Sequence, residues 1–106
     1  MRWGWISAVS GLGLIAFGSG ASAGCLTHDG NGRFHNNCGE KVIFTFRTIG
    51  GGCFERGYGS ETASAGGSVK TAANYSCNGR YPARVEWVWC SYDAWTKGRC
   101  IAKFDD

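Results

Sequence analysis

Six cysteines set the kind of fold that this chain can adopt. An even number of cysteines in a short chain, behind an apolar leader, is typical of an exported domain held by disulfide bonds. The six are Cys25, Cys38, Cys53, Cys77, Cys90 and Cys100. We therefore expect three bridges and an oxidising compartment. Six cysteines allow many pairings, and the one that we predict is Cys90–Cys100, which would close the turn at 92–98.

The first 23 residues have the order of regions expected in a secretion signal. Arg2 gives a positive start, an apolar run covers 3–17, and Ala-Ser-Ala at 21–23 has the small-x-small pattern that precedes a cleavage site. The apolar run is shorter than the roughly 20 residues that span a bilayer, and Gly and Ser interrupt it. We therefore predict a signal peptide at 1–23, a single domain at 24–106, no retained membrane span, and a secreted or periplasmic location.

Residues 22–25, Ser-Ala-Gly-Cys, also resemble a bacterial lipobox, in which Cys25 would become an acylated first residue. Such a box usually has Leu at the position of Ser22. Acylation would also leave five cysteines, and therefore one unpaired thiol, in an oxidising compartment. We expect Cys25 to form a bridge instead.

The size of the domain makes the bridges necessary. A chain of about 80 residues buries only about 60% of its unfolded surface, so its core alone leaves it marginally stable. Each disulfide adds about 2–4 kcal/mol by restricting the unfolded chain. The formal net charge is only +3, from 11 basic and 8 acidic side chains scattered along the sequence. That pattern gives no support to a nucleic-acid partner.

The secondary-structure pattern is that of strands. Residues 41–47 and 84–90 are β-branched and aromatic runs without a breaker, and 67–72 and 99–104 are shorter strand candidates. No window has the i, i+3, i+4 apolar spacing of an amphipathic helix. Glycine clusters between the runs indicate turns and flexible connections. We predict an all-β fold: a small disulfide-stapled antiparallel sandwich or barrel with long glycine-rich loops.

Aromatic side chains provide the most suggestive candidate site. Side chains alternate across a strand, so Trp87 and Trp89 share one face of the second long run, and Tyr92 and Trp95 follow just beyond it. If the neighbouring cysteine is cross-linked toward the interior, the two tryptophans face outward. The four rings would then form a platform of the kind on which sugar rings stack. The alternative is that Trp87 and Trp89 fill the core of a domain that is short of apolar volume.

Two histidines, His28 and His35, are the basis for an enzyme hypothesis. A small hydrolase could pair either of them with a carboxylate and a nearby arginine for acid–base catalysis. The available acids are Glu40, Glu55, Glu61 and Glu86. Both histidines lie in a Gly/Asn-rich segment, where a solvated loop is the ordinary expectation. We therefore favour a protein without catalytic residues.

Metal and cofactor chemistry has no support in the motifs. No two cysteines have the close spacing of zinc ligands. The sequence also lacks a Gly-x-Ser-x-Gly nucleophile motif and a phosphate-binding glycine loop. We expect no metal and no cofactor.

Three short segments resemble known groups of proteins. Asn-Asn-Cys at 36–38 leads into the run 41–47, Gly-Gly-Ser at 66–68 precedes a short strand, and the second long run ends in Trp-Cys at 89–90. This pattern resembles a group of uncharacterised small secreted bacterial proteins with six cysteines. Its opening also has a local similarity to the opening strand of thaumatin-like domains. The resemblance implies a β-sandwich and secretion, and it implies no activity.

Three functions fit these features. The first is a non-enzymatic binding protein for a glycan, a cell-wall polymer or another protein, with the aromatic platform as its contact surface. The alternative is a secreted inhibitor, toxin or antimicrobial effector, whose rigid loop 50–59 inserts into a target. That loop carries Cys53, Phe54, Arg56 and Tyr58. The third is the small hydrolase that uses His28 or His35.

Overall fold

The two long runs of the sequence form the centre of the fold. The computed structural model describes residues 23–105, and in it these runs are β3 (Val42–Ile49) and β6 (Arg84–Ser91). The strands pair antiparallel over their whole length. Both are rich in β-branched and aromatic residues, which favour a pleated, half-buried surface. The predicted signal peptide lies outside the described residues, except for Ala23.

The remaining elements are short. They are η1 (Ala23–Cys25), β1 (Leu26–His28), β2 (Arg33–Asn36), β4 (Gly59–Ala63), β5 (Ser68–Lys70) and α1 (Tyr92–Thr96). The expectation of a strand at 67–72 is met by β5. Helix α1 lies where the sequence indicated a turn, and Ser91 caps it by accepting a hydrogen bond from the Ala94 amide. In residues 23–105 no helix is long and apolar enough to cross a bilayer.

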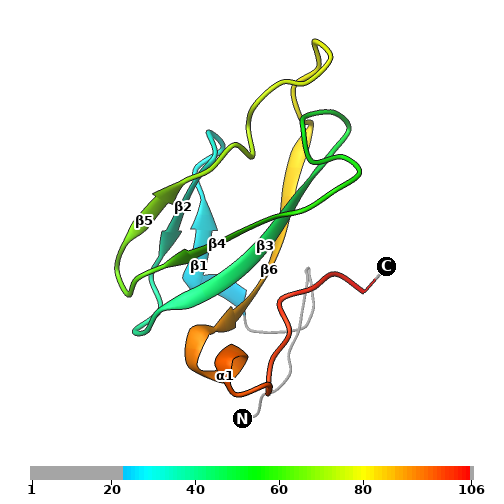
Figure 1. The fold of residues 1–106 in the computed structure, drawn as a ribbon. Helices are drawn as coiled ribbons and strands as arrows, with labels where there is room; N and C mark the ends of the chain where they lie inside the picture. The colour runs from blue at the N-terminus through cyan, green and yellow to red at the C-terminus, as the bar shows by residue number, and fades with distance from the viewer. Residues whose placement is uncertain (1–22, 106) are drawn as a thin grey trace.

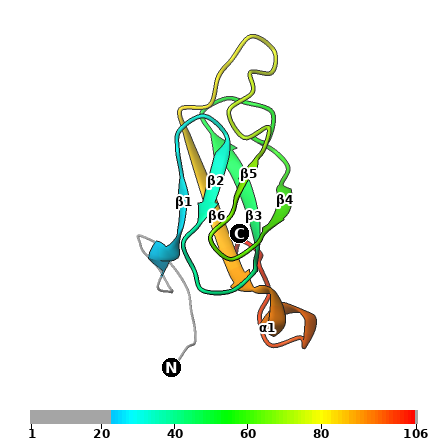
Figure 2. The ribbon, with the colours of Figure 1, turned by 90° about the vertical axis from the view of Figure 1, so that its left-hand side faces the viewer.

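Six strands form two antiparallel sheets that pack face to face. The smaller sheet has the order β1-β2-β5 and the larger one β4-β3-β6. Figure 1 shows the two layers, and in Figure 2 the smaller sheet lies in front of the larger one. The predicted all-β, disulfide-stapled fold is therefore confirmed, and between the two architectures left open it is the sandwich.

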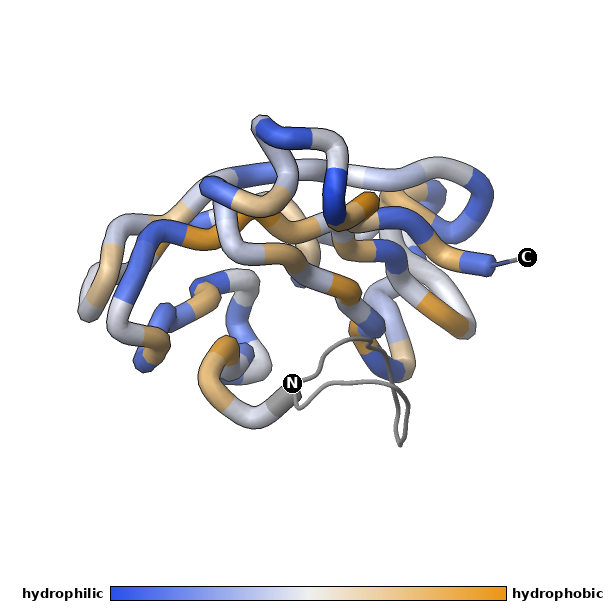
Figure 3. The backbone as a smooth tube through the Cα atoms, turned by 90° about the horizontal axis from the view of Figure 1, so that it is seen from below, coloured by the Kyte–Doolittle hydropathy of each residue, from blue (hydrophilic) through white to orange (hydrophobic). Residues whose placement is uncertain are grey.

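The core lies between the two sheets. Phe34 of β2 is fully buried, and its ring centroid lies 4.6 Å from that of Phe44 and 5.7 Å from that of Phe46, both on β3. Val42, also fully buried, continues the same face because side chains alternate along a strand. Figure 3 shows how apolar positions alternate with hydrophilic ones along the chain. Each sheet thus contributes one apolar face, which is the usual construction of a sandwich.

The histidine-bearing segment is a hairpin rather than the expected solvated loop. Strands β1 and β2 pair antiparallel, with His28 opposite Phe34. The carboxylate of Asp29 accepts hydrogen bonds from the amides of Asn31 and Arg33 at 2.6 and 3.2 Å and so holds the turn. Its backbone hydrogen bonds lower the pKa of Asp29. An Asp at this position stabilises a turn through its own side chain. The resulting hairpin places Phe34, which lies in a polar stretch of the sequence, in the core.

The prediction of a strand at 99–104 is wrong. Residues 99–105, here called the C-terminal strap, form no strand and lie along the outer face of the larger sheet (Figure 1, red). The hydroxyl of Thr45 donates to the carbonyl of Ala102 at 2.6 Å, and the Arg47 guanidinium lies 4.1 Å from the Phe104 ring centroid. The strap therefore covers the larger sheet with side-chain contacts, without adding a strand to its ladder.

The disulfides join consecutive cysteines. They are Cys25–Cys38, Cys53–Cys77 and Cys90–Cys100. The predicted Cys90–Cys100 pair is confirmed, and Cys25 is a bridge partner, as expected. Cys90 is buried, but it lies on the face of β6 opposite Trp87 and Trp89, where the strap covers it. Burial of this cysteine therefore does not place the tryptophans on the outside.

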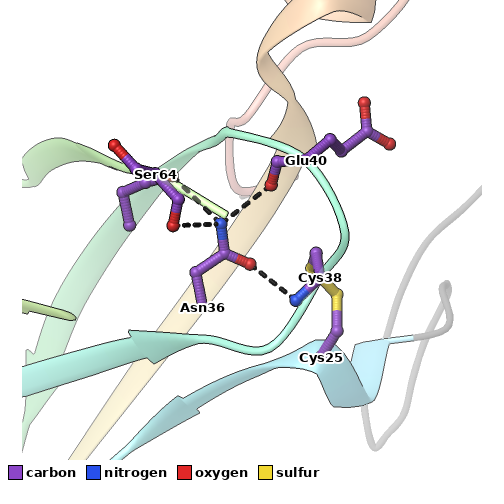
Figure 4. Close-up of a disulfide and its surroundings, with 6 residues drawn as sticks. Cys25, Asn36, Cys38, Glu40 and Ser64 are labelled. Carbon is purple, nitrogen blue, oxygen red and sulfur yellow. Dashed lines mark hydrogen bonds between the residues drawn. A yellow bond between two sulfur atoms is a disulfide. The ribbon is translucent and has the colours of Figure 1, made fainter. Parts of the chain in front are cut away.

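Asn36 joins the two sheets beside the first disulfide (Figure 4). The side chain is fully buried, and its Nδ2 donates to the carbonyls of Glu40, Ala63 and Ser64 at 2.9, 3.0 and 3.0 Å. Its Oδ1 accepts from the Cys38 amide at 2.7 Å. Asn36 ends β2 and Ala63 ends β4, so one amide satisfies backbone groups from both layers.

Candidate functional site

The predicted tryptophan pair lies on the inner face of β6. Trp87 is opposite Phe46 in the β3–β6 register and Trp89 is opposite Phe44, so both share the core face of the sheet. The Trp87 ring meets Phe34 edge-on, with centroids 5.4 Å apart. Both tryptophans are half-buried against the core. They fill the core at the β1/β6 side of the sandwich and keep part of their surface in solvent, so a role in ligand contact stays a prediction.

The other two predicted aromatic residues belong to α1. The rings of Tyr92 and Trp95 lie 5.6 Å apart, and Lys41 Nζ lies 4.2 Å from the Tyr92 ring centroid. Trp95 is 41% exposed, whereas Tyr92 is half-buried. The structure thus places Tyr92 and Trp95 side by side on α1, whereas Trp87 packs against the core.

The two histidines have different surroundings. His28 lies between the sheets, where its ring packs against Phe34 and Trp87 and its Nε2 accepts a hydrogen bond from the Gly32 amide at 3.0 Å. Burial lowers the pKa of His28, and the nearby Asp29 charge opposes that effect. A neutral imidazole that accepts from a turn amide has a structural role in the β1–β2 hairpin.

His35 is on the outer face of the smaller sheet, where its Nδ1 lies 2.6 Å from the hydroxyl of Ser68. The distance suits a nucleophile and its base, but a Ser–His pair also needs a group that orients the imidazole. Within residues 23–105 no carboxylate hydrogen-bonds His35, and the pair is exposed rather than set in a cleft. The hydrolase hypothesis is therefore supported by the His35–Ser68 distance alone, and neither an orienting carboxylate nor a cleft accompanies it in the described residues.

A pocket of about 310 Å³ opens on the opposite side of the sandwich, between the edge strands β4 and β5. We call it the β4/β5 pocket. Its size is at the lower end of sites that hold small molecules, which begin at about 300 Å³. The residues that give it chemical character are Phe46, Phe54, Ser60, Glu61, Lys70 and Tyr75. The Ser60 hydroxyl lies 3.0 Å from that of Thr45 on the outer face of the larger sheet. The pocket therefore combines an apolar floor with the Glu61 carboxylate, the Tyr75 hydroxyl and Lys70 at its β5 edge.

The sheet register directs Glu61 toward the pocket. Glu61 is opposite Phe44 on β3, so it lies on the inner face of β4, although that side of the sandwich is open enough to leave it exposed. Within residues 23–105 it forms no ion pair. Its carboxylate is therefore available to a ligand.

The pocket floor is rigid. The Phe46 ring covers Gly59 so closely that a Cβ there would lie 2.2 Å from the ring, which explains the glycine at the start of β4. Phe54 packs edge-on against Phe46, with centroids 5.0 Å apart. Cys53 is bridged to Cys77, so the loop that carries Phe54 is tied to the loop that carries Tyr75. The disulfide therefore fixes two walls of the pocket relative to each other.

The loop 50–59 is mostly exposed, but two of its aromatic side chains pack against the rest of the domain. Phe54 contributes to the pocket floor, and Tyr58 stacks on Phe104 of the strap at 5.5 Å. Cys53 and Arg56 are exposed. Sequence reasoning named Glu61 only as a possible partner of a histidine and missed Tyr75, because no local pattern links positions that the Cys53–Cys77 bridge and the β3–β4 pairing bring together.

Residues 23–105 contain no group of three His, Cys, Asp or Glu side chains placed to hold a metal ion.

No family description matches this chain, and no curated protein or solved structure resembles it significantly. The candidate site therefore rests on its own geometry.

Proposed function

We propose that this protein is a small non-enzymatic binding domain, secreted or periplasmic, that holds a glycan in the β4/β5 pocket. The observation that carries the proposal is the composition of that pocket. A sugar ring has an apolar face, which can stack on an aromatic ring, and a rim of hydroxyls, which need donors and acceptors. Tyr75, 55% exposed, provides the ring, and Glu61 and Lys70 provide the polar groups.

The oxidised state of the domain supports an extracytoplasmic location. Three disulfides indicate an oxidising compartment, because thiols stay reduced in the cytosol. A pocket floor fixed by aromatic packing and a disulfide also suits binding, since it needs no ordering on association.

Titration with soluble cell-wall and plant oligosaccharides, followed by NMR and calorimetry, tests the proposal. Loss of an aromatic contact is worth about 0.5–1.5 kcal/mol, so Tyr75→Ala should weaken binding by up to about tenfold. Glu61→Gln should weaken it by a similar factor. The matched control is Tyr81→Ala, because Tyr81 is 72% exposed and does not line the pocket. Binding that depends on Trp95 and ignores Tyr75 would instead favour the aromatic platform. Absence of binding to every glycan would refute both sites.

A second candidate is the inhibitor, toxin or antimicrobial effector, and the disulfide-linked loops favour it. Within the loop 71–83 the chain reverses in a tight turn at Asn78 and Gly79, both at positive φ. Two 3.0 Å backbone hydrogen bonds between Cys77 and Arg80 close this turn. It presents Tyr81 in a rigid setting, and exposed tyrosines often anchor protein interfaces. Under this alternative Tyr81→Ala abolishes target inhibition or toxicity, whereas Tyr75→Ala does not.

A further inference from the structure

The outer face of the smaller sheet carries polar residues in cross-strand rows. His35 of β2 lies between Thr27 of β1 and Ser68 of β5, and in the next row Arg33 of β2 lies opposite Lys70 of β5. Side chains of directly opposed residues are about 4.5–5.5 Å apart at Cβ. This face looks toward the viewer in Figure 2, and within residues 23–105 no segment crosses it.

Arg33 and Lys70 are like charges at directly opposed positions of the smaller sheet. Opposed like charges destabilise a sheet, so such a pair normally has an acidic neighbour. Neither side chain forms an ion pair in the described part of the chain. The carboxylate closest in sequence, Asp29, affects Arg33 electrostatically, but its Oδ1 is occupied by the Asn31 and Arg33 amides.

Some acids elsewhere on the surface are paired with bases. Glu86 meets Arg47 at 3.0 Å, and Asp93 meets Lys97 at 3.0 Å. Among residues 23–105 the Arg33–Lys70 pair has no such acidic partner, and its donors are complementary to an anion.

Lys70 connects this face to the pocket. It lies on the edge strand β5, opposite Arg33, and it also lines the β4/β5 pocket. A polymer whose one sugar sits in the pocket would pass over β5 and meet Arg33 next. The hydroxyl of Ser68 and the ring of His35, 2.6 Å apart, extend this path with further hydrogen-bonding groups.

We propose that the glycan bound by this domain is an acidic polysaccharide, and that Arg33 and Lys70 hold its carboxylate or sulfate groups. The inference rests on the proposed function, because it assigns the charge of the same ligand. The polar pocket takes the hydroxyls of one sugar, and the cationic pair takes the anionic substituent of a neighbouring sugar.

The test compares polygalacturonate oligomers with the same oligomers after methyl esterification, which removes the charge and keeps the sugar backbone. We expect the acidic form to bind several-fold more tightly and to weaken with added salt, since salt screens exposed charges. Exposed charge contacts are worth at most about 1 kcal/mol, so Arg33→Gln and Lys70→Gln should each weaken acidic-oligomer binding about two- to fivefold. Arg33→Gln should weaken binding of the acidic form more than binding of the esterified form.

Lys103→Gln is the charge-matched control, because Lys103 lies in the C-terminal strap on the outer face of the other sheet. An equal effect of Lys103→Gln and Arg33→Gln would show non-specific attraction and overturn the inference. Equal binding of both oligomer forms, with loss in Tyr75→Ala, would overturn the inference and leave the glycan pocket standing. Acidic binding unaffected by Tyr75→Ala would overturn the pocket alone. Tighter binding to polyphosphate or to anionic lipid vesicles than to polygalacturonate would refute a glycan as the ligand.

Discussion

Replacing Asn36 by aspartate reverses the hydrogen-bonding character of one buried atom without changing the shape of the side chain. In the native protein the amide nitrogen faces three carbonyl oxygens at 2.9–3.0 Å. An ionised aspartate would place a negatively charged oxygen against all three. The backbone amide of Cys38 would keep its acceptor, because the other oxygen stays in place.

The three carbonyl oxygens repel an ionised carboxylate, so the folded variant must keep this carboxyl protonated, and that requirement sets the loss in the free energy of unfolding. Holding it protonated near pH 7, about three pH units above its ordinary pKa of roughly 3.9, costs about 4 kcal/mol at 1.36 kcal/mol per unit. A protonated carboxyl donates one hydrogen bond where the amide has two N–H groups, which adds about 1 kcal/mol. The total of about 5 kcal/mol is comparable to the whole stability of a marginal domain.

Urea unfolding of Asn36→Asp with its disulfides intact measures this cost, and Asn37→Asp is the matched control because Asn37 is exposed. The folded-state pKa of the new carboxyl is raised, so the variant recovers stability as the pH falls toward about 4 and loses it again as the pH rises. The control should stay within about 0.5 kcal/mol of the parent. Equal unfolding midpoints for the two variants, or a loss that ignores pH, would refute the reasoning.

Three further outcomes are expected. Burial lowers the pKa of His28 in the folded state. The contribution of His28 to stability is therefore full above its unfolded-state pKa of about 6.5 and falls as the pH drops through that value. Unfolding midpoints measured at several pH values above about 5 should show this slope, and His28→Gln should remove it. Gly51 has φ of 137°, and a Cβ there would lie 2.3 Å from the Tyr81 carbonyl oxygen, so Gly51→Ala should lower the free energy of unfolding by about 3 kcal/mol in denaturant. The control Gly57→Ala, where nothing lies within 4 Å of the added Cβ, should lower it hardly at all. Similar losses in the two variants would contradict the packing argument. Replacing both Cys90 and Cys100 by alanine should cost about 2–3 kcal/mol and expose the C-terminal strap to trypsin, and a strap that still resists cleavage would show that its side-chain contacts suffice.

The sequence predicted those strands whose pattern is decided locally. Residues 42–49 and 84–91 alternate without a breaker, so pairing only completed what their composition favoured. Strand β4, Gly-Ser-Glu-Thr-Ala, has no such signature and forms because the edge of β3 provides its hydrogen-bonding partner. The segment 99–104 shows the reverse case. Its apolar residues suggested a strand, but Phe104 packs under Arg47 and beside Tyr58 as a cover over the sheet.

The candidate site was out of reach of sequence patterns for a related reason. Glu61 and Tyr75 belong to different parts of the chain, and only the strand register and one particular disulfide bring them to one pocket. The tryptophans show how a local rule can be correct and still insufficient. Trp87 and Trp89 do share a face, but it is the face that packs against the core, and Cys90 on the other face is buried under the strap.

The order of the disulfide pairs has a consequence for how the protein matures. Each bridge joins a cysteine to the next one along the chain, at separations of 13, 24 and 10 residues. A chain that emerges N-terminus first therefore exposes each correct partner before any later cysteine can compete. An oxidant that joins thiols in their order of appearance produces the native set directly, without a reshuffling step. A chain oxidised in this order has no wrong pair for a disulfide isomerase to correct.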